Sequence, residues 1–240
     1  MSQPLPLAGY RVVDYSHFIA GPYLSRCLAA MGAEVIKVER PKAGDPGRAH
    51  PYFIGGQSGY YLQQNMGKRG LCVDLKDPRG LALLHRLTDE ADVFVENYRP
   101  GTMERLGLGY AELASRNPKL VYCSISANGH TGPDAGQAGY GLIAEAKGGA
   151  MAMIGEPGTP PPLLRIALAD MVTGIHGVAA VCAALDVRIA DLDGRLLLFD
   201  GVGCDVSLFS RRSVGEDGRT YGLADPDTTL FAERCRANIV

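Results

Sequence analysis

The sequence lacks the features that mark several broad classes of protein. None of its apolar runs reaches the roughly 18 residues that a membrane-spanning helix needs. Its start, MSQPLPLAGY, has no basic segment followed by an apolar one, so it does not resemble a signal peptide. The formal net charge of −2 provides no basic field for nucleic acid or an anionic membrane. We therefore expect neither nucleic-acid nor membrane partners.

Paired cysteines are absent as well. The chain has six cysteines, but they are scattered and form none of the C-x-x-C pairs typical of zinc sites. Most of them lie within apolar segments, which also argues against a disulfide framework. We expect reduced thiols, no metal site and a cytoplasmic location.

Two short functional motifs are missing too. The chain contains neither the G-x-G-x-x-G dinucleotide fingerprint nor the G-x-S-x-G nucleophile elbow. Its histidines at 130 and 176 have no serine or cysteine partner at a diagnostic spacing. A hydrolase triad is therefore poorly supported.

What the sequence does contain is a regular alternation of strand and helix patterns. Short apolar segments predict buried strands at 10–16, 34–40, 70–75, 92–97 and 120–126. Amphipathic segments predict helices at 21–33, 77–91, 110–117 and 141–154. A strand, a helix and a strand within about 30 residues form a βαβ unit, which favours parallel pairing. We predict an α/β fold with an open, mostly parallel sheet and flanking helices.

This rhythm stops near residue 190. Residues 127–139 are rich in glycine and polar side chains and predict a loop, and 155–162 predict a turn rich in proline and glycine. Beyond 190 the periodicity is weak and aspartate, glycine and arginine are frequent. We expect one domain over 1–190, with 191–240 a divergent tail or the start of a linker.

Ligands in open α/β sheets bind at the carboxyl ends of the strands. This rule selects 16–22, 39–48, 74–78, 96–107 and 126–133. Four cations lie near these strand ends: Arg40, Lys76, Arg99 and Arg105. Arginine forks match phosphate geometry, so their convergence would suit a phosphorylated ligand, whereas any one of them alone is ordinary surface charge.

Asp170 is an isolated acid at the head of the apolar stretch 163–185. Aspartate is a preferred N-cap, which gives it a structural role. Gly174 and Gly177 follow, and they weaken a helix by up to about 1 kcal/mol each unless a close approach requires them. Residue chemistry alone leaves the cap and the functional carboxylate equally supported.

Several stretches together resemble the class III CoA-transferase family, which includes formyl-CoA and carnitine CoA-transferases and the α-methylacyl-CoA racemases. The resemblance begins with LAGYRVVDYSHFIAGPYLSRCLAAMGAEVIKVERPKAGDPGR and continues through GKRGLCVDLKDPRG and ADVFVENYRPGTMERLGLGYAEL. It closes with ALADMVTGIHGVAAVCAAL, so that it covers roughly residues 5–188 in order.

The resemblance implies a Rossmann-like large domain that binds CoA, with Asp170 as the catalytic aspartate. It implies a CoA pocket formed by His17, Ile19, Ala20, Arg40, Leu75, Lys76, Asn97, Tyr98, Met103 and Arg105. Coenzyme A and acyl-CoA enter as substrates, and no permanently bound cofactor is expected. The second partner would be a carboxylic acid that accepts CoA.

The implied reaction moves CoA through an aspartyl anhydride and an aspartyl–CoA thioester. The racemase branch carries a His-Asp pair where this sequence has Tyr140 and Gly141, so CoA transfer is favoured over racemisation. Ile19 replaces a glutamine of formyl-CoA transferases, which argues against oxalate or formate as substrates. Family members are longer interlocked homodimers, and their second domain is not recognisable here. A non-catalytic CoA-binding module therefore stays open as a further alternative.

Overall fold

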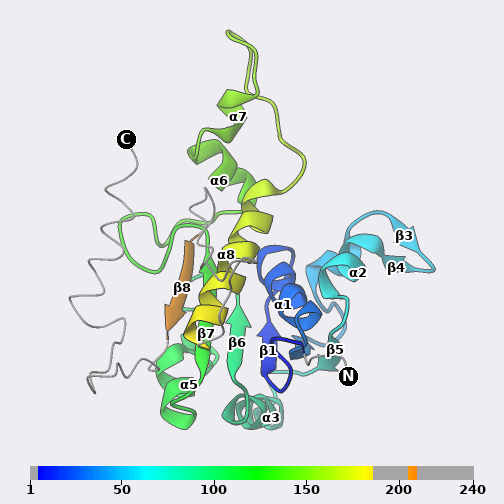
Figure 1. The fold of residues 1–240 in the computed structure, drawn as a ribbon, viewed down its shortest axis with the longest axis vertical. Helices are drawn as coiled ribbons and strands as arrows, with labels where there is room; N and C mark the ends of the chain where they lie inside the picture. The colour runs from blue at the N-terminus through cyan, green and yellow to red at the C-terminus, as the bar shows by residue number, and fades with distance from the viewer. Residues whose placement is uncertain (1–4, 186–204, 210–240) are drawn as a thin grey trace.

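A single mostly parallel sheet organises the computed structural model, which describes residues 5–185 and 205–209 (Figure 1). The strand order is β5-β2-β1-β6-β7-β8. Five strands run parallel: β1 (Arg11–Tyr15), β2 (Glu34–Glu39), β5 (Arg69–Cys72), β6 (Val93–Glu96) and β7 (Val121–Ser126). β8 (Asp205–Phe209) pairs antiparallel to β7 at one edge. The predicted α/β class is confirmed.

Each buried strand contributes side chains to two apolar cores, because successive side chains point to opposite faces of the sheet. Val12 lies in one apolar core and Val13 in the other, and Val93 and Phe94 alternate in the same way. Helices α1 (Ala20–Ala30) and α8 (Leu168–Ala184) cover the first face. Helices α3 (Pro78–Asp89) and α5 (Tyr110–Arg116) cover the second. Near-continuous apolar strands are what a sheet covered on both faces requires.

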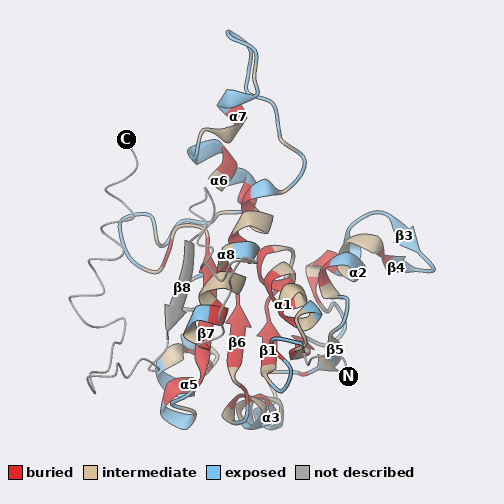
Figure 2. Ribbon diagram, viewed as in Figure 1, coloured by how far each residue is buried: buried red, intermediate tan, exposed pale blue. Residues whose placement is uncertain are grey.

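One predicted helix is in fact two. The segment 141–154 forms α6 (Gly141–Lys147) and α7 (Ala150–Met153), so the prediction of one continuous helix was wrong. The break follows from Gly149, whose φ of +78° lies in the left-handed region that ends helices. Together with the turn after α7, these helices form an arm that extends beyond the sheet, and much of its surface is exposed (Figures 1 and 2).

The segment between β2 and β5 carries structure that the sequence patterns did not predict. It contains the 3₁₀ helix η1 (Pro46–Ala49), the small hairpin of β3 (Phe53–Ile54) and β4 (Gln57–Ser58), and helix α2 (Gly59–Asn65). The short helix α4 (Thr102–Arg105), after β6, was also not predicted. These elements are shorter than the window that periodicity needs.

The remaining expectations concern the end of the chain. The predicted tail, 191–240, lies outside the described residues except for β8, so its role stays a prediction. Within the described part of the chain, no helix is long and apolar enough to cross a membrane.

Candidate active site

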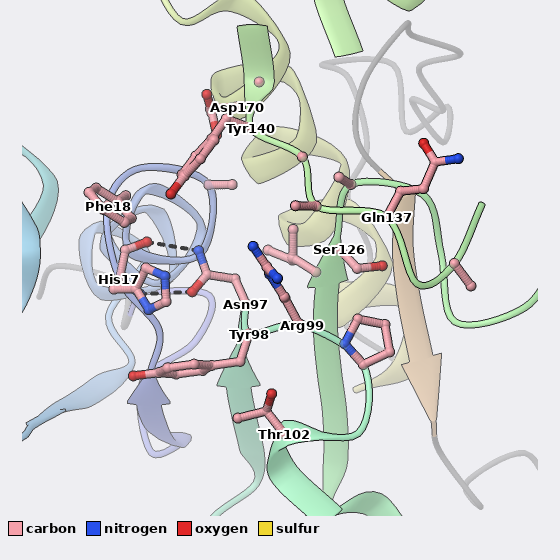
Figure 3. Close-up of a pocket in the computed structure, with 18 residues that line it drawn as sticks. His17, Phe18, Asn97, Tyr98, Arg99, Thr102, Ser126, Gln137, Tyr140 and Asp170 are labelled. Carbon is pink, nitrogen blue, oxygen red and sulfur yellow. Dashed lines mark hydrogen bonds between the residues drawn. The ribbon is translucent and has the colours of Figure 1, made fainter. Parts of the chain in front are cut away.

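A pocket of about 330 Å³ opens at the carboxyl ends of β1, β6 and β7, where the strand-end rule predicts a ligand (Figure 3). Residues that follow the three strands line its floor, and the start of α6 and α8 lines the opposite side. The side chains that face it include His17, Phe18, Asn97, Arg99, Tyr140 and Asp170.

The loop after β1 is fixed by Asn97, which directly follows the neighbouring strand β6. Asn97 Oδ1 accepts a hydrogen bond from His17 N at 2.8 Å, and Asn97 Nδ2 donates to His17 O at 2.7 Å. The Tyr98 ring meets the His17 imidazole edge-on, with 4.5 Å between centroids. Burial lowers the pKa of His17, which favours the neutral imidazole. The pocket floor is therefore held in one shape before any ligand binds.

A buried group of four charges lies beneath this loop. Lys37 Nζ is 3.1 Å from Asp45 Oδ2 and 3.7 Å from Asp14 Oδ1, and Lys68 Nζ is 2.9 Å from Asp14 Oδ2. Burial alone would raise the pKa of Asp14, but Lys37 and Lys68 hold it below its usual range. Burial lowers the pKa of Lys68 to about 8. We call Asp14, Lys37, Asp45 and Lys68 the charge cluster.

The charge cluster also holds the backbone of the loop. Lys37 Nζ donates to Ser16 O, and Asp14 Oδ1 accepts from Ser16 N at 2.9 Å. Asp45 Oδ1 accepts from the amide of Phe18 at 3.1 Å. Phe18 has a φ of +63°, which is uncommon for a residue other than glycine and costs of order 1–3 kcal/mol. The cluster therefore stabilises a backbone shape that the loop would not adopt by itself.

Asp170 lies in the first turn of α8, but it is not the N-cap. The cap position is Ala167, whose φ of +47° is left-handed and whose side chain makes no capping hydrogen bond. The capping role considered for Asp170 was therefore wrong. Burial, together with the neighbouring Glu145, raises the pKa of Asp170 to about 6. The Asp170 carboxyl group therefore does not serve as the N-cap of α8, and it is more basic than the carboxyl group of an exposed aspartate.

Two glycines permit close packing of α8, one beside Asp170 and one against α1. A Cβ on Gly141 would lie 2.0 Å from Asp170 Oδ2, so no other residue fits there without movement. A Cβ on Gly174 would lie 3.1 Å from Ala20 O, because α8 packs directly on α1. The close approach expected at Gly174 is therefore made to a helix backbone.

The pocket brings together five of the predicted site residues: His17, Ala20, Asn97, Tyr98 and Asp170. Arg40 lines a smaller adjoining hollow of about 80 Å³ that shares His17 and Tyr98.

The other predicted CoA contacts do not line the main pocket. Ile19 is the N-cap residue of α1, and Leu75 packs partly buried against the core under α3. Lys76 and Arg105 are exposed, and Met103 is buried in the same core as Leu75. Their roles in binding CoA stay predictions.

Several residues that line the pocket were not included among the predicted contacts. Phe18 and Ser126 belong to segments that the strand-end rule selected, so position was a usable signal for them. Of the four strand-end cations named from the sequence, Arg99 lines this pocket. Gln137 lies in the predicted loop 127–139 and Tyr140 directly follows it, but the sequence pattern did not reveal the course of this loop.

Comparison with protein families gives this pocket a context. Residues 7–210 match the model of a family described as CoA-transferase family III. The chain belongs to this family. All five predicted residues that line the pocket lie within the matched range.

Individual relatives agree with this family membership. The chain is 45% identical over 187 residues to a succinate–glutarate CoA-transferase of Agrobacterium fabrum, with 75% of this chain and 47% of that protein covered. It is 41% identical over 230 residues to the succinyl-CoA:glutarate CoA-transferase of Homo sapiens, with 93% and 52% covered. The chain thus spans about half the length of these curated CoA-transferase relatives.

A solved structure shares the family III fold. A crystal structure of a CAIB/BAIF family protein from Brucella suis superposes with a TM-score of 0.73 at 40% sequence identity. The superposition covers 78% of this chain and 50% of that one.

Proposed function

We propose that this chain carries the CoA-binding and nucleophilic part of a CoA-transferase, with Asp170 as the nucleophile. The observation that supports this most is the position of Asp170. Its carboxyl group does not cap α8, has a raised pKa and faces a preformed pocket at the carboxyl ends of parallel strands. The same residues lie within the range that matches CoA-transferase family III.

The chemistry suits a carboxylate because a thioester releases a good leaving group. An Asp170 oxygen attacks the thioester carbonyl, the C–S bond breaks, and CoA thiolate leaves an aspartyl anhydride. The thiolate then attacks the aspartyl carbonyl, which frees the donor acid and leaves an aspartyl–CoA thioester. The acceptor carboxylate attacks this thioester and displaces the thiolate, which then attacks the acceptor carbonyl of the new anhydride. The product is acyl-CoA, and Asp170 is regenerated.

We propose that the acid substrates are dicarboxylates. The relatives named above act on succinate and glutarate according to their names. Arg99 supplies an exposed cation at the pocket, and its guanidinium points into the cavity in Figure 3, where it can pair with a second carboxylate. Equal rates of transfer to acetate and to glutarate would contradict this choice.

A covalent adduct on Asp170 is the direct test of the proposed reaction. Incubation of the chain with succinyl-CoA, followed by peptide mass spectrometry, is expected to show CoA or succinyl attached to the peptide that contains Asp170. Hydroxylamine should convert the adduct to a hydroxamate at the same residue. Tight CoA binding by calorimetry without any adduct would instead support the non-catalytic module. Exchange of the α-proton of a 2-methylacyl-CoA would support the racemase alternative.

We propose that the functional form is the interlocked homodimer implied by the resemblance. The arm exposes apolar side chains that a partner would cover: Met153 is 82% exposed, and Leu163 and Ile166 are 55% and 60% exposed. Light scattering after size-exclusion chromatography is expected to give twice the chain mass. A monomer at micromolar concentration would exclude a stable dimer of this chain.

A further inference from the structure

A buried acid, Glu145, lies beside the half-buried Asp170. Glu145 comes from α6, in the arm, and is only 3% exposed. Its Oε1 accepts a hydrogen bond from the amide of Ala169 at 3.2 Å. Ala169 directly precedes Asp170 in the first turn of α8. The Glu145 carboxylate is therefore attached to the backbone that carries the proposed nucleophile.

No cation compensates this pair of acids within the described residues. No ion pair reaches Glu145 or Asp170 in that part of the chain, although the pocket contains the Arg99 guanidinium further along its wall. Lys147, two residues after Glu145, is turned to Asp134 and Asn128. Two neighbouring acids without a paired cation oppose each other's ionisation, because each would add a negative charge beside the other.

The other titratable groups around Asp170 come from three further segments. Tyr60 from α2 is close enough that the charge of Asp170 raises its pKa, together with burial. His17 faces the pocket from the loop after β1, and Tyr140 faces it from the residue before α6. A tyrosine is uncharged at neutral pH, and His17 has a lowered pKa, so neither places a positive charge beside the two acids.

We propose that Glu145 is a positioning residue that acts through Asp170: it anchors the first turn of α8, and its negative charge opposes the ionisation of the Asp170 carboxyl group. The inference rests on the proposed role of Asp170 as nucleophile. Its chemical value is that a more basic carboxylate is a stronger nucleophile toward a thioester, provided that it is ionised at the working pH. The raised pKa of Asp170, to about 6, meets both conditions near pH 7.

Glu145→Gln separates the two parts of this role. The glutamine keeps a side-chain oxygen that accepts from Ala169 N, but it removes the charge. We expect the titration midpoint of Asp170 to fall by about one unit in E145Q, since a like charge at this range shifts a carboxyl pKa by an amount of that order. Glu145→Ala should lower the midpoint and also loosen the start of α8. Glu112→Gln, which changes an exposed acid on α5, is the matched control.

The measurement is carbon-13 NMR of the full chain labelled at the aspartate carboxyl, with the Asp170 signal assigned by its loss in Asp170→Asn. It needs neither substrate nor turnover. An unchanged Asp170 midpoint in E145Q, with Glu112→Gln as reference, would overturn the proposal. In an exchange assay, the acidic limb of kcat/KM should move to lower pH in E145Q by the same shift. If Asp170→Asn retained exchange, the proposed function would fail while the NMR titration still decided the role of Glu145.

Discussion

Asp170→Asn is expected to abolish the exchange of labelled acid into acyl-CoA. The asparagine amide has nearly the same shape, but it lacks the nucleophilic oxygen that the reaction needs. Loss of a sole nucleophile commonly reduces turnover by on the order of 10⁴-fold or more. The assay follows labelled glutarate or succinate into the acyl-CoA pool. Glu112→Gln, which changes an exposed acid on α5, should leave exchange unchanged.

The same Asp170→Asn substitution is expected to stabilise the fold at neutral pH. The pKa of Asp170 is about 6 in the folded chain and about 3.9 when unfolded. Between these values the folded state binds more protons than the unfolded state, so stability falls as pH rises from about 4 to about 6. Above pH 6 the half-buried carboxylate lowers the free energy of unfolding by about 3 kcal/mol.

Thermal unfolding of both forms measures this effect. Asparagine cannot ionise, so its advantage over aspartate should be present at pH 8 and vanish near pH 4. Lost exchange without higher stability at pH 8 would contradict the raised pKa, but would leave the nucleophile assignment intact. Retained exchange would contradict the assignment itself.

Lys37→Met is expected to destabilise the chain by about 3–5 kcal/mol. Lys37 is 1% exposed and lies between Asp14 and Asp45, so its removal leaves Asp45 buried without its cation. Methionine fills much of the same volume, so the loss reflects charge more than packing. Urea unfolding should show a lower midpoint with an unchanged slope.

Lys119→Met provides the control for this substitution because its side chain is exposed. It should change the free energy of unfolding by less than about 0.5 kcal/mol. The Lys37→Met variant should also bind CoA more weakly, since Lys37 holds the loop that carries His17. Equal stability of Lys37→Met and Lys119→Met would show that the charge cluster makes no net contribution to the free energy of unfolding.

The sheet was predictable because its strands are apolar, short and regularly spaced. The five predicted strands all form, with ends that differ by at most three residues. Burial on both faces left a strong pattern in segments such as 120–126, where every residue of β7 is buried. The parallel order followed from the length of the crossovers.

The failures have local causes that a pattern of apolar residues does not contain. The continuous helix expected over 141–154 is broken at Gly149, and glycine alone does not reveal whether its φ will be positive. The capping role of Asp170 failed because α8 begins two residues earlier, after Ala167 in a left-handed conformation. Tertiary contacts with α1 and α6, rather than capping chemistry, fix that start.

The location of the site could be predicted from the sequence better than the set of residues that line it. Strand ends identified the loops after β1, β6 and β7, and the family resemblance selected Asp170 within α8. The side chains beside Asp170 could not be predicted from the sequence because they come from another element. Glu145 lies in the interior of a helical pattern, where an acid is ordinarily solvated, and only the packing of α6 on α8 buries it.

The packing of α8 on α1 has a consequence for folding. Helices α1 and α8 share a core, so the pocket is completed by contacts between segments far apart in the sequence. Such contacts are slow to form because the long loop between them must close first. During synthesis the strand-end loops emerge well before α8. In a nascent chain Asp170 therefore joins the pocket only after the loops that form its floor have emerged.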